Sequence, residues 1–419
     1  MFGNLSYDLF PKMVRVRQRF ESPKVENLRD KMERELSKTE IEGLVGEGMR
    51  IAILVGSRGI KRIDEIVHEV IKFCVEKKAI PFIVPAMASH GGATDEGQKD
   101  LLRSLGIDEQ SMGVRIISDM LPERLGETIG GVPVYFDKNA LAADGVIVIN
   151  RVKAHTAFRG EHESGLVKML TIGAGKQKGA ESLHSQGADT FGILLPEAFK
   201  VIKAKADILF GVAVIENAEE KTAHIETVHA DRILERETEL LKLSKKLMPK
   251  ILLDHFDVLI VDELGKNISG DGMDPNITGR YAVPGISGGP NYQRLVLLDV
   301  TDQSHGNAIG IGMADVTTRK LVSKINYEFM YLNAFTSKMV LDLVKIPLVC
   351  ETEKEAVAVA LRTCVRVKKG QERIVRIKNT LELSEIQISV NLLKEIENSN
   401  NFDILTEPFE MEFNDTVKV

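Results

Sequence analysis

The first half of the chain alternates short apolar runs with amphipathic segments, and this rhythm restricts the fold more than any other feature. Residues 51–55 and 80–84 are apolar runs of strand length, and 61–78 has apolar residues at helical spacing. Such a repeat predicts a mainly parallel sheet with helices on both faces, an α/β fold. Further strands are expected at 114–118, 132–136, 145–149, 207–214 and 257–261, and further helices at 95–105, with Thr94 as N-cap, and at 230–247.

A length of 419 residues indicates more than one hydrophobic core. The interval 265–290 is rich in Gly, Pro and Asn and has no clear periodicity. Beyond it, helices near 317–325 and 334–344 and a strand at 373–379 predict a second α/β domain. We therefore expect one domain at 1–265, a hinge loop at 266–290 and a second domain at 291–419, whose last segment can return to the first. The active site is expected in the crevice between the two domains.

The composition excludes several classes of protein. A formal net charge of −6 argues against a general binder of nucleic acid or anionic membranes, and the absence of Trp disfavours stacking on single-stranded bases. The three cysteines form no CxxC pair, so they predict neither a disulfide framework nor a cysteine zinc site. No signal-peptide apolar region or membrane-length apolar run is present. These features predict a cytoplasmic protein that binds neither nucleic acid nor membrane; a homo-oligomer is compatible with them.

Two loops that leave expected strands carry candidate binding residues. In the first, glycines flank Ser57 and Arg58, so the backbone can approach a ligand while Arg58 offers a planar fork for a carboxylate or phosphate. The alternative is a plain turn with a surface arginine. In the second, His90 lies in a Ser-His-Gly-Gly turn and can act as a base near neutral pH. Both loops lie at carboxyl ends of strands, where open α/β sheets bind ligands.

The segment 150–186 is the densest polar stretch of the chain and follows an expected strand directly. It contains His155, His162, Lys168 and His184. Spacing alone leaves a metal site, a two-base site and a Schiff-base site open. The Gly-rich part, with Gly173, Gly175 and Lys176, could cradle a phosphate, although it matches neither the P-loop nor the dinucleotide-binding pattern. The alternative is a flexible basic loop.

A further polar stretch, 262–280, has acids and amides at close spacing. It lacks the residue order and the terminal Glu of an EF-hand loop, so a hinge-and-substrate loop is a better interpretation than a calcium site. The remaining histidines have no supporting context and are interpreted as structural or surface residues. They are His68, His224, His229, His255 and His305.

Together, the loop at 55–60, the Ser-His-Gly-Gly-Ala-Thr loop and the later His and Lys residues resemble the nickel-pincer lactate racemases. The resemblance covers most of the first 260 or so residues. It implies that Arg58, with Ser57, holds the substrate carboxylate and that His90 and His155 are the two catalytic bases. It also implies that Lys168 carries the cofactor covalently and that His184, sixteen residues later, binds nickel. The separation of Lys168 and His184 is the most specific part of the match.

The chain departs from the family in three places. Its segment from the second base to the lysine is longer, as if residues were inserted around 159–163, so His162 competes with His155 for the role of second base. Ser-Gly-Leu-Val precedes Lys168, which differs from the family's sequence. The Gln and Lys substrate contacts of the second domain have no clear counterpart, and the stretch 265–280 occupies their place. The departures leave the identity of the substrate open.

The resemblance implies racemisation or epimerisation of a 2-hydroxy acid. In the family a hydride moves reversibly to a nickel-pincer nucleotide (a nickel pyridinium-3-thioamide-5-thiocarboxylic acid mononucleotide) while one histidine takes the hydroxyl proton. The cofactor would be bound to Lys168, near Gly173, Gly175 and Lys176, with His184 as nickel ligand. Enzymes that make this cofactor would be partners of the protein.

Two other functions remain open from the sequence. One is a hydro-lyase, cofactor-independent or dependent on another metal, with His90 and His155 as acid and base. The other is a non-catalytic protein that binds a small anion on the same scaffold. Tolerance of Lys168→Ala would favour the hydro-lyase, and ligand affinity that survives His90→Ala would favour the binding protein.

Overall fold

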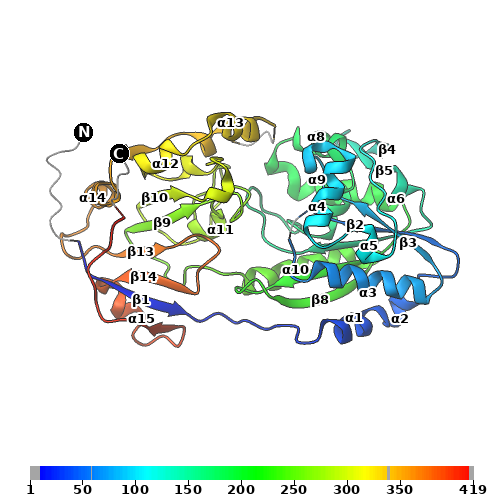
Figure 1. The fold of residues 1–419 in the computed structure, drawn as a ribbon, viewed down its shortest axis with the longest axis horizontal. Helices are drawn as coiled ribbons and strands as arrows, with labels where there is room; N and C mark the ends of the chain where they lie inside the picture. The colour runs from blue at the N-terminus through cyan, green and yellow to red at the C-terminus, as the bar shows by residue number, and fades with distance from the viewer. Residues whose placement is uncertain (1–9, 58, 337–339, 415–419) are drawn as a thin grey trace. The chain divides into compact units, whose positions relative to one another are not determined.

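The computed structural model describes residues 10–57, 59–336 and 340–414, and the chain forms two compact units (Figure 1). Unit 2 is the continuous segment Ser22–Met248, and unit 1 combines the chain up to Glu21 with the chain from Pro249 onward. These units do not coincide with the expected limits at 265 and 291, because the first strand and the chain from Pro249 pack in one sheet. Among the described residues, no helix is long and apolar enough to cross a membrane.

The sheet of unit 2 has the order β3-β2-β6-β7-β8. Its strands are β2 (Arg50–Val55), β3 (Ile80–Pro85), β6 (Gly145–Arg151), β7 (Ile208–Glu216) and β8 (Thr222–His229). The first four in the sheet order are parallel, and β8 pairs antiparallel with β7. The chain passes from β2 to β3 on one side and later places β6 on the other side of β2. The carboxyl ends of β2 and β6 therefore flank the point where the strand order reverses, which is where such sheets bind ligands.

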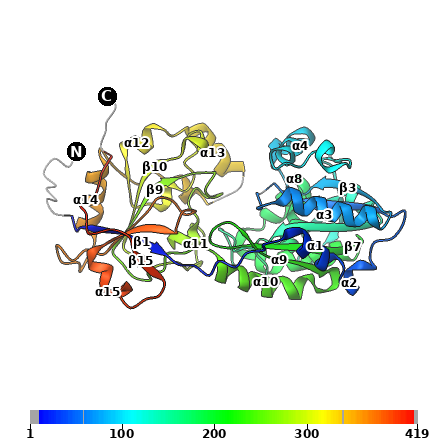
Figure 2. The same ribbon diagram turned by 60° about the horizontal axis from the view of Figure 1, so that its bottom comes forward.

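Alternating strand residues divide the apolar core of unit 2 into two layers. Ala52 and Leu54 of β2 face a core built with the helices that follow β6, namely α8 (Lys176–His184), α9 (Phe191–Lys203) and α10 (Ile233–Leu247). Ile51 and Ile53 face a second core with α1 (Leu28–Leu36) and α3 (Ile63–Glu76). Figure 2 shows the helices α1 and α3, which pack against each other. Because side chains of a strand alternate in direction, strands buried on both faces are apolar throughout. The predicted parallel sheet covered on both faces is confirmed.

The remaining elements of unit 2 are short. They are α2 (Thr39–Glu42), α4 (Asp95–Ser104), α5 (Glu109–Met112), α6 (Lys138–Leu141) and α7 (Leu166–Lys168), with the hairpin β4 (Pro122–Glu127) and β5 (Pro133–Asp137). The Thr94 side chain accepts from the Gly97 N–H at the start of α4, so the predicted N-cap is confirmed.

In unit 2 the strand predicted at 114–118 was wrong, and the strand predicted at 132–136 is present but lies in another sheet. Residues 114–118 form only a bridge between Ile83 and Ile116 instead of a strand. Residues 132–136 fall largely in β5, which pairs with β4 in a separate antiparallel sheet and not with the parallel strands. The turn at Gly130 and Gly131 explains this, because a Gly-Gly turn joins neighbouring segments into a hairpin.

Unit 1 is built on an eight-stranded sheet with the order β12-β11-β10-β9-β13-β14-β1-β15. The strands are β1 (Met13–Gln18), β9 (Val258–Leu264), β10 (Arg294–Val300), β11 (Val316–Thr318), β12 (Leu348–Cys350), β13 (Ile374–Ile377), β14 (Glu385–Ser389) and β15 (Phe402–Ile404). The first five strands of this order, β12, β11, β10, β9 and β13, pair with one another in parallel. The remaining pairings, β13 with β14, β14 with β1 and β1 with β15, are antiparallel. β1, from the start of the chain, lies between β14 and β15.

The helices of unit 1 are α11 (Pro275–Thr278), α12 (Arg319–Ser323), α13 (Tyr327–Thr336), α14 (Glu353–Thr363) and α15 (Leu393–Ile396). Residues 317–325 were expected to form one helix. The first two of them belong to β11 instead, and the helix α12 follows, with the Thr318 side chain as its N-cap. The helix expected at 334–344 is displaced: α13 ends at Thr336, and Leu341–Val344 is a 3-10 turn. Because short strands, helices and turns alternate in this region, the sequence has no helical periodicity that marks the helix ends.

Candidate functional site

The predicted site residues of unit 2 follow the strands β2, β3 and β6 at their carboxyl ends. Ser57 comes two residues after β2, His90 five residues after β3 and His155 four residues after β6. Because these strands are adjacent and parallel, their carboxyl ends lie at one edge of the sheet. The fold therefore gathers residues from three loops at the point where the strand order reverses.

His90 and Ser57 form a direct pair across two loops. The Ser57 hydroxyl is hydrogen-bonded to Nδ1 of His90. This bond fixes the orientation of the imidazole and directs Nε2 away from Ser57. Ser57, predicted as a substrate contact, thus lies where it orients a predicted base. Arg58, the predicted carboxylate ligand, lies outside the described residues.

The loop that carries His90 has an unusual backbone held by buried groups. Ala88 and Ala93 have φ values of 53° and 54°, and Gly91 and Gly92 also have positive φ. Alanine at positive φ is strained, and such residues gather where the surroundings fix a functional loop. The buried Gln98 side chain of α4 donates from Nε2 to the carbonyl of Ala88 at 2.9 Å. The Ala88 N–H donates to the Gly173 carbonyl at 3.0 Å, which ties this loop to the Gly-rich segment.

His155 and Lys168 form the second pair. His155 Nε2 lies 2.7 Å from Lys168 Nζ, and His155 Nδ1 accepts the Ala157 N–H at 3.0 Å. Burial lowers the pKa of His155 well below 6.5, and the charges of Lys168, Lys153, His184 and Arg159 lower it further. His155 is therefore a neutral imidazole at neutral pH.

The contact between Lys168 Nζ and His155 Nε2 joins an amine to a neutral imidazole. Which of the two nitrogens donates depends on the tautomer of the ring. The geometry therefore places a proton-exchanging nitrogen of His155 directly beside the Lys168 amine.

His184 is connected to the His155–Lys168 pair by a series of ring contacts. It ends α8 and stacks on Phe191 at 5.3 Å between ring centroids; Phe191 contacts Phe158 at 5.1 Å, and Phe158 contacts His155 at 4.3 Å. The π-helical turn Met169–Gly173 lies between Lys168 and α8. Such turns occur often at functional sites. The structure thus brings His155, Lys168 and His184 into one cluster.

His162, the competitor for the second base, lies elsewhere. It is buried, and its Nδ1 lies 3.3 Å from the Glu237 carboxylate of α10. Lys168 Nζ lies 2.7 Å from His155 Nε2. This placement favours His155 as the base.

The Gly-rich segment has a packing role in this structure. A Cβ on Gly173 would lie 2.6 Å from the Ala86 carbonyl, and one on Gly175 would lie 2.9 Å from the Thr171 carbonyl. Lys176, predicted at a cofactor phosphate, is instead fully buried, with Nζ 3.0 Å from Asp137 and 2.6 Å from the Pro85 carbonyl. These residues hold the loops around His90 in place.

Sequence reasoning missed three buried polar residues of this region, namely Gln98, Glu163 and Glu237. Glu163 accepts the His155 N–H at 2.6 Å, and Glu237 accepts the Val167 N–H at 3.0 Å. Glu237 has a signal in the sequence, because an acidic residue on the apolar face of a predicted helix needs a buried partner.

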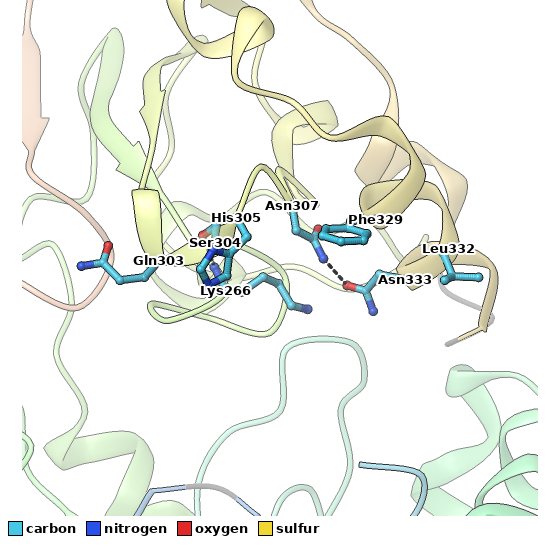
Figure 3. Close-up of a pocket in the computed structure, with 8 residues that line it drawn as sticks. All are labelled: Lys266, Gln303, Ser304, His305, Asn307, Phe329, Leu332 and Asn333. Carbon is cyan, nitrogen blue, oxygen red and sulfur yellow. Dashed lines mark hydrogen bonds between the residues drawn. The ribbon is translucent and has the colours of Figure 1, made fainter. Parts of the chain in front are cut away.

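Unit 1 has a separate pocket of about 530 Å³ (Figure 3). It is lined by Lys266, Gln303, Ser304, His305, Asn307 and Asn333 with the apolar Phe329 and Leu332. Lys266 follows β9 and Ser304 follows β10, so the pocket lies outside the carboxyl ends of parallel strands. Lys266 donates from Nζ to the Gly270 carbonyl at 2.7 Å. None of the lining residues is acidic, which suits a small anion; His305 was predicted to be structural or a surface residue.

No group of three metal-ligating side chains occurs among the residues that the structure describes. No protein-family model and no curated protein matches the chain. Among solved structures, the lactate racemase apoprotein from Thermoanaerobacterium thermosaccharolyticum is similar, with a TM-score of 0.53 and 13% sequence identity. The similarity covers 88% of this chain and 99% of that chain. At this identity it shows a shared α/β fold.

Proposed function

We propose that this protein is a racemase or epimerase of a 2-hydroxy acid that uses a nickel-pincer nucleotide attached to Lys168. The observation that carries the proposal is the 2.7 Å contact between Lys168 Nζ and His155 Nε2, in one cluster with His184. The lactate racemase fold of the structural neighbour is consistent with it. The sequence resemblance assigned these three residues the roles of tether, base and nickel ligand.

The residues present fit such a group. Attachment through a thioamide requires an amine, and Lys168 Nζ supplies one 2.7 Å from the neutral imidazole of His155. His184 offers an imidazole nitrogen, a borderline ligand that would suit Ni²⁺. When bound, the nucleotide would supply the acceptor and donor of hydride. We assign no role in binding it to Lys176, because that side chain is buried against Asp137.

The two histidines would exchange protons with the substrate hydroxyl. His90 is oriented by Ser57, and His155 by Glu163 and the Ala157 N–H, so each imidazole is held by a different loop. One enantiomer would give its hydroxyl proton to one histidine, and the product would receive a proton from the other. Arg58 is proposed to bind the substrate carboxylate.

The test is co-expression with the cofactor-making enzymes, followed by intact mass, nickel content and polarimetry on a panel of 2-hydroxy acids. We expect added mass on Lys168, bound nickel and racemisation of at least one acid. Lys168→Ala should abolish the mass and the activity, whereas Lys205→Ala, at an exposed position of unit 2, should retain both. A protein that stays unmodified beside a co-expressed lactate racemase that becomes modified would contradict the proposal.

The pocket of unit 1 favours a second candidate, a protein that binds a small anion without catalysis. Its lining offers amides, a hydroxyl, an imidazole and one lysine, with an apolar wall. Under this candidate, a small carboxylate raises the melting temperature of the protein, Lys266→Met removes the effect, and His90→Ala leaves the affinity unchanged. Calorimetry with lactate and phosphate on these two variants separates it from the racemase.

A further inference from the structure

The loop between β6 and α7 is anchored to α10 through two side-chain contacts, each of which involves a buried carboxylate. Glu163 of the loop accepts from Lys245 Nζ at 2.7 Å, and His162 of the loop lies 3.3 Å from Glu237. Glu237 and Lys245 are eight residues apart on α10, so they lie on the same face of this helix. The loop thus presents a carboxylate to a lysine of α10 and an imidazole to a carboxylate of α10.

Each carboxylate of this arrangement also binds the backbone beside a site residue. The second oxygen of Glu163 accepts the N–H of His155 at 2.6 Å, and Arg159 lies 3.5 Å from it. The second oxygen of Glu237 accepts the N–H of Val167, the residue before Lys168, at 3.0 Å. The two carboxylates are therefore hydrogen-bonded directly to the backbone of His155 and of the segment that carries Lys168.

Gly165 allows the Glu237 carboxylate to come this close. A Cβ at this position would lie 2.4 Å from the carboxylate oxygen. The Gly165 carbonyl accepts from the Asn150 side chain at 2.7 Å, which ties the end of the loop to the end of β6. A side chain at position 165 would therefore displace the Glu237 carboxylate from its hydrogen bond to Val167.

We propose that His162, Glu163, Glu237 and Lys245 form a clamp that sets the distance between His155 and Lys168. They are positioning residues and touch no substrate in this scheme. The segment 159–163 looked inserted relative to the lactate racemases. In this proposal it connects the loop with His155 and Lys168 to α10. The proposal rests on the proposed function only in taking His155 and Lys168 as the reacting pair.

The test measures acetylation of Lys168 in the full chain by a limiting dose of acetic anhydride, with peptide mass spectrometry. The exposed Lys178 serves as internal reference. Lys245→Met leaves Glu163 buried without its ammonium partner, so the loop shifts and Lys168 loses its contact with His155. We expect its relative labelling to fall about 10-fold or more, the range seen when a supporting residue is removed. Lys245→Arg should retain most of the labelling, and Lys242→Met, at an exposed position of α10, should retain all of it.

Glu237→Gln is a second variant that keeps the shape of the side chain and removes the charge facing His162. It should also lower the labelling of Lys168, while the melting temperature shows that the protein is folded. Wild-type labelling in both folded variants would overturn the clamp. In the cofactor-loaded enzyme, Lys245→Met should lower kcat about 10-fold with KM changed less than about threefold, because the clamp acts on the reacting groups and not on substrate affinity. If the wild type racemises no acid but the labelling changes as expected, the clamp stands and the proposed function fails.

Discussion

At the scale of single residues, the site depends on the contact between an imidazole and an amine. His155 Nε2 lies 2.7 Å from Lys168 Nζ, and its other nitrogen accepts from the Ala157 backbone. Burial and the surrounding positive charges lower the pKa of His155, so the ring is neutral at neutral pH and places no second positive charge beside the lysine.

The first prediction concerns the pKa of His155. Lys168→Met removes the largest electrostatic cause of its lowered pKa, whereas burial, the leading cause, remains. We expect the pKa to rise but to stay below 6.5. NMR titration of ¹³C-labelled histidine measures it, with Lys205→Met as control at an exposed position. An unchanged pKa in Lys168→Met would show that the two groups do not interact.

The lowered pKa also affects stability with a defined sign. Above pH 6.5 the ring is neutral in both the folded and the unfolded chain, so the contribution of His155 to stability is fully present. As the pH falls from 6.5 toward the lowered folded pKa, the unfolded chain binds a proton that the folded protein excludes, and stability is lost. In Lys168→Met this loss should end at a higher pH, which denaturation at several pH values can measure.

A second prediction concerns the buried pair of Lys176 and Asp137. Lys176→Met leaves the Asp137 carboxylate buried without its cation, and breaking a buried pair in this way costs about 3–5 kcal/mol. Urea denaturation measures the loss, and Lys205→Met should stay within about 0.5 kcal/mol of the wild type. A loss below about 1 kcal/mol would mean that Asp137 finds water or another partner.

At the scale of elements, the Gly-rich segment acts through close packing. Gly173→Ala would bring a Cβ to 2.6 Å from the Ala86 carbonyl and 2.7 Å from Met169 Sδ, so the loop after β3 and the π-helical turn must move apart. We expect a loss of about 1–3 kcal/mol, as for overpacked cores. Gly43→Ala, where a Cβ meets nothing within 4 Å, is the matched control and should be neutral. Equal stabilities of the two variants would contradict this packing role.

The elements also show how far the sequence could predict this molecule. The strands β2, β3, β6 and β7 could be predicted because double-sided burial makes them apolar throughout, and α3, α4 and α10 because their apolar residues recur at helical spacing. The pairing of β4 with β5 was missed because it depends on a Gly-Gly turn, and the pattern of apolar residues carries no information about such a turn. The short alternating elements near 316–344 are too brief for a periodicity to develop.

For the site, the sequence supplied the residues but not their relations. His90, His155, Lys168 and His184 were identified from loops and from spacing, and the structure places the last three together. The contact of Ser57 with His90 and the burial of Lys176 required coordinates, because partners 33 and 91 residues apart meet only in the folded chain. The choice of His155 over His162 as base stays a prediction.

At the scale of the whole molecule, unit 1 depends on a strand from the other end of the chain. β1 pairs with β14 on one side and β15 on the other, so deletion of residues 1–21 opens the sheet and leaves two unpaired edges. We expect the shortened chain to lose the unfolding transition of unit 1 in calorimetry and to retain that of unit 2, Ser22–Met248. Loss of both transitions would show that unit 2 requires unit 1 for stability.

The place of β1 also sets an order of events during synthesis. Arg17 and its partner Glu385 are 368 residues apart, so at ribosomal speeds β1 waits roughly 20–70 s before its neighbours exist. Unit 2 is continuous and complete long before then, so it can fold while β1 is still unpaired. A strand that is made long before its partners exposes unpaired edges during synthesis, where chaperones can protect it from mispairing.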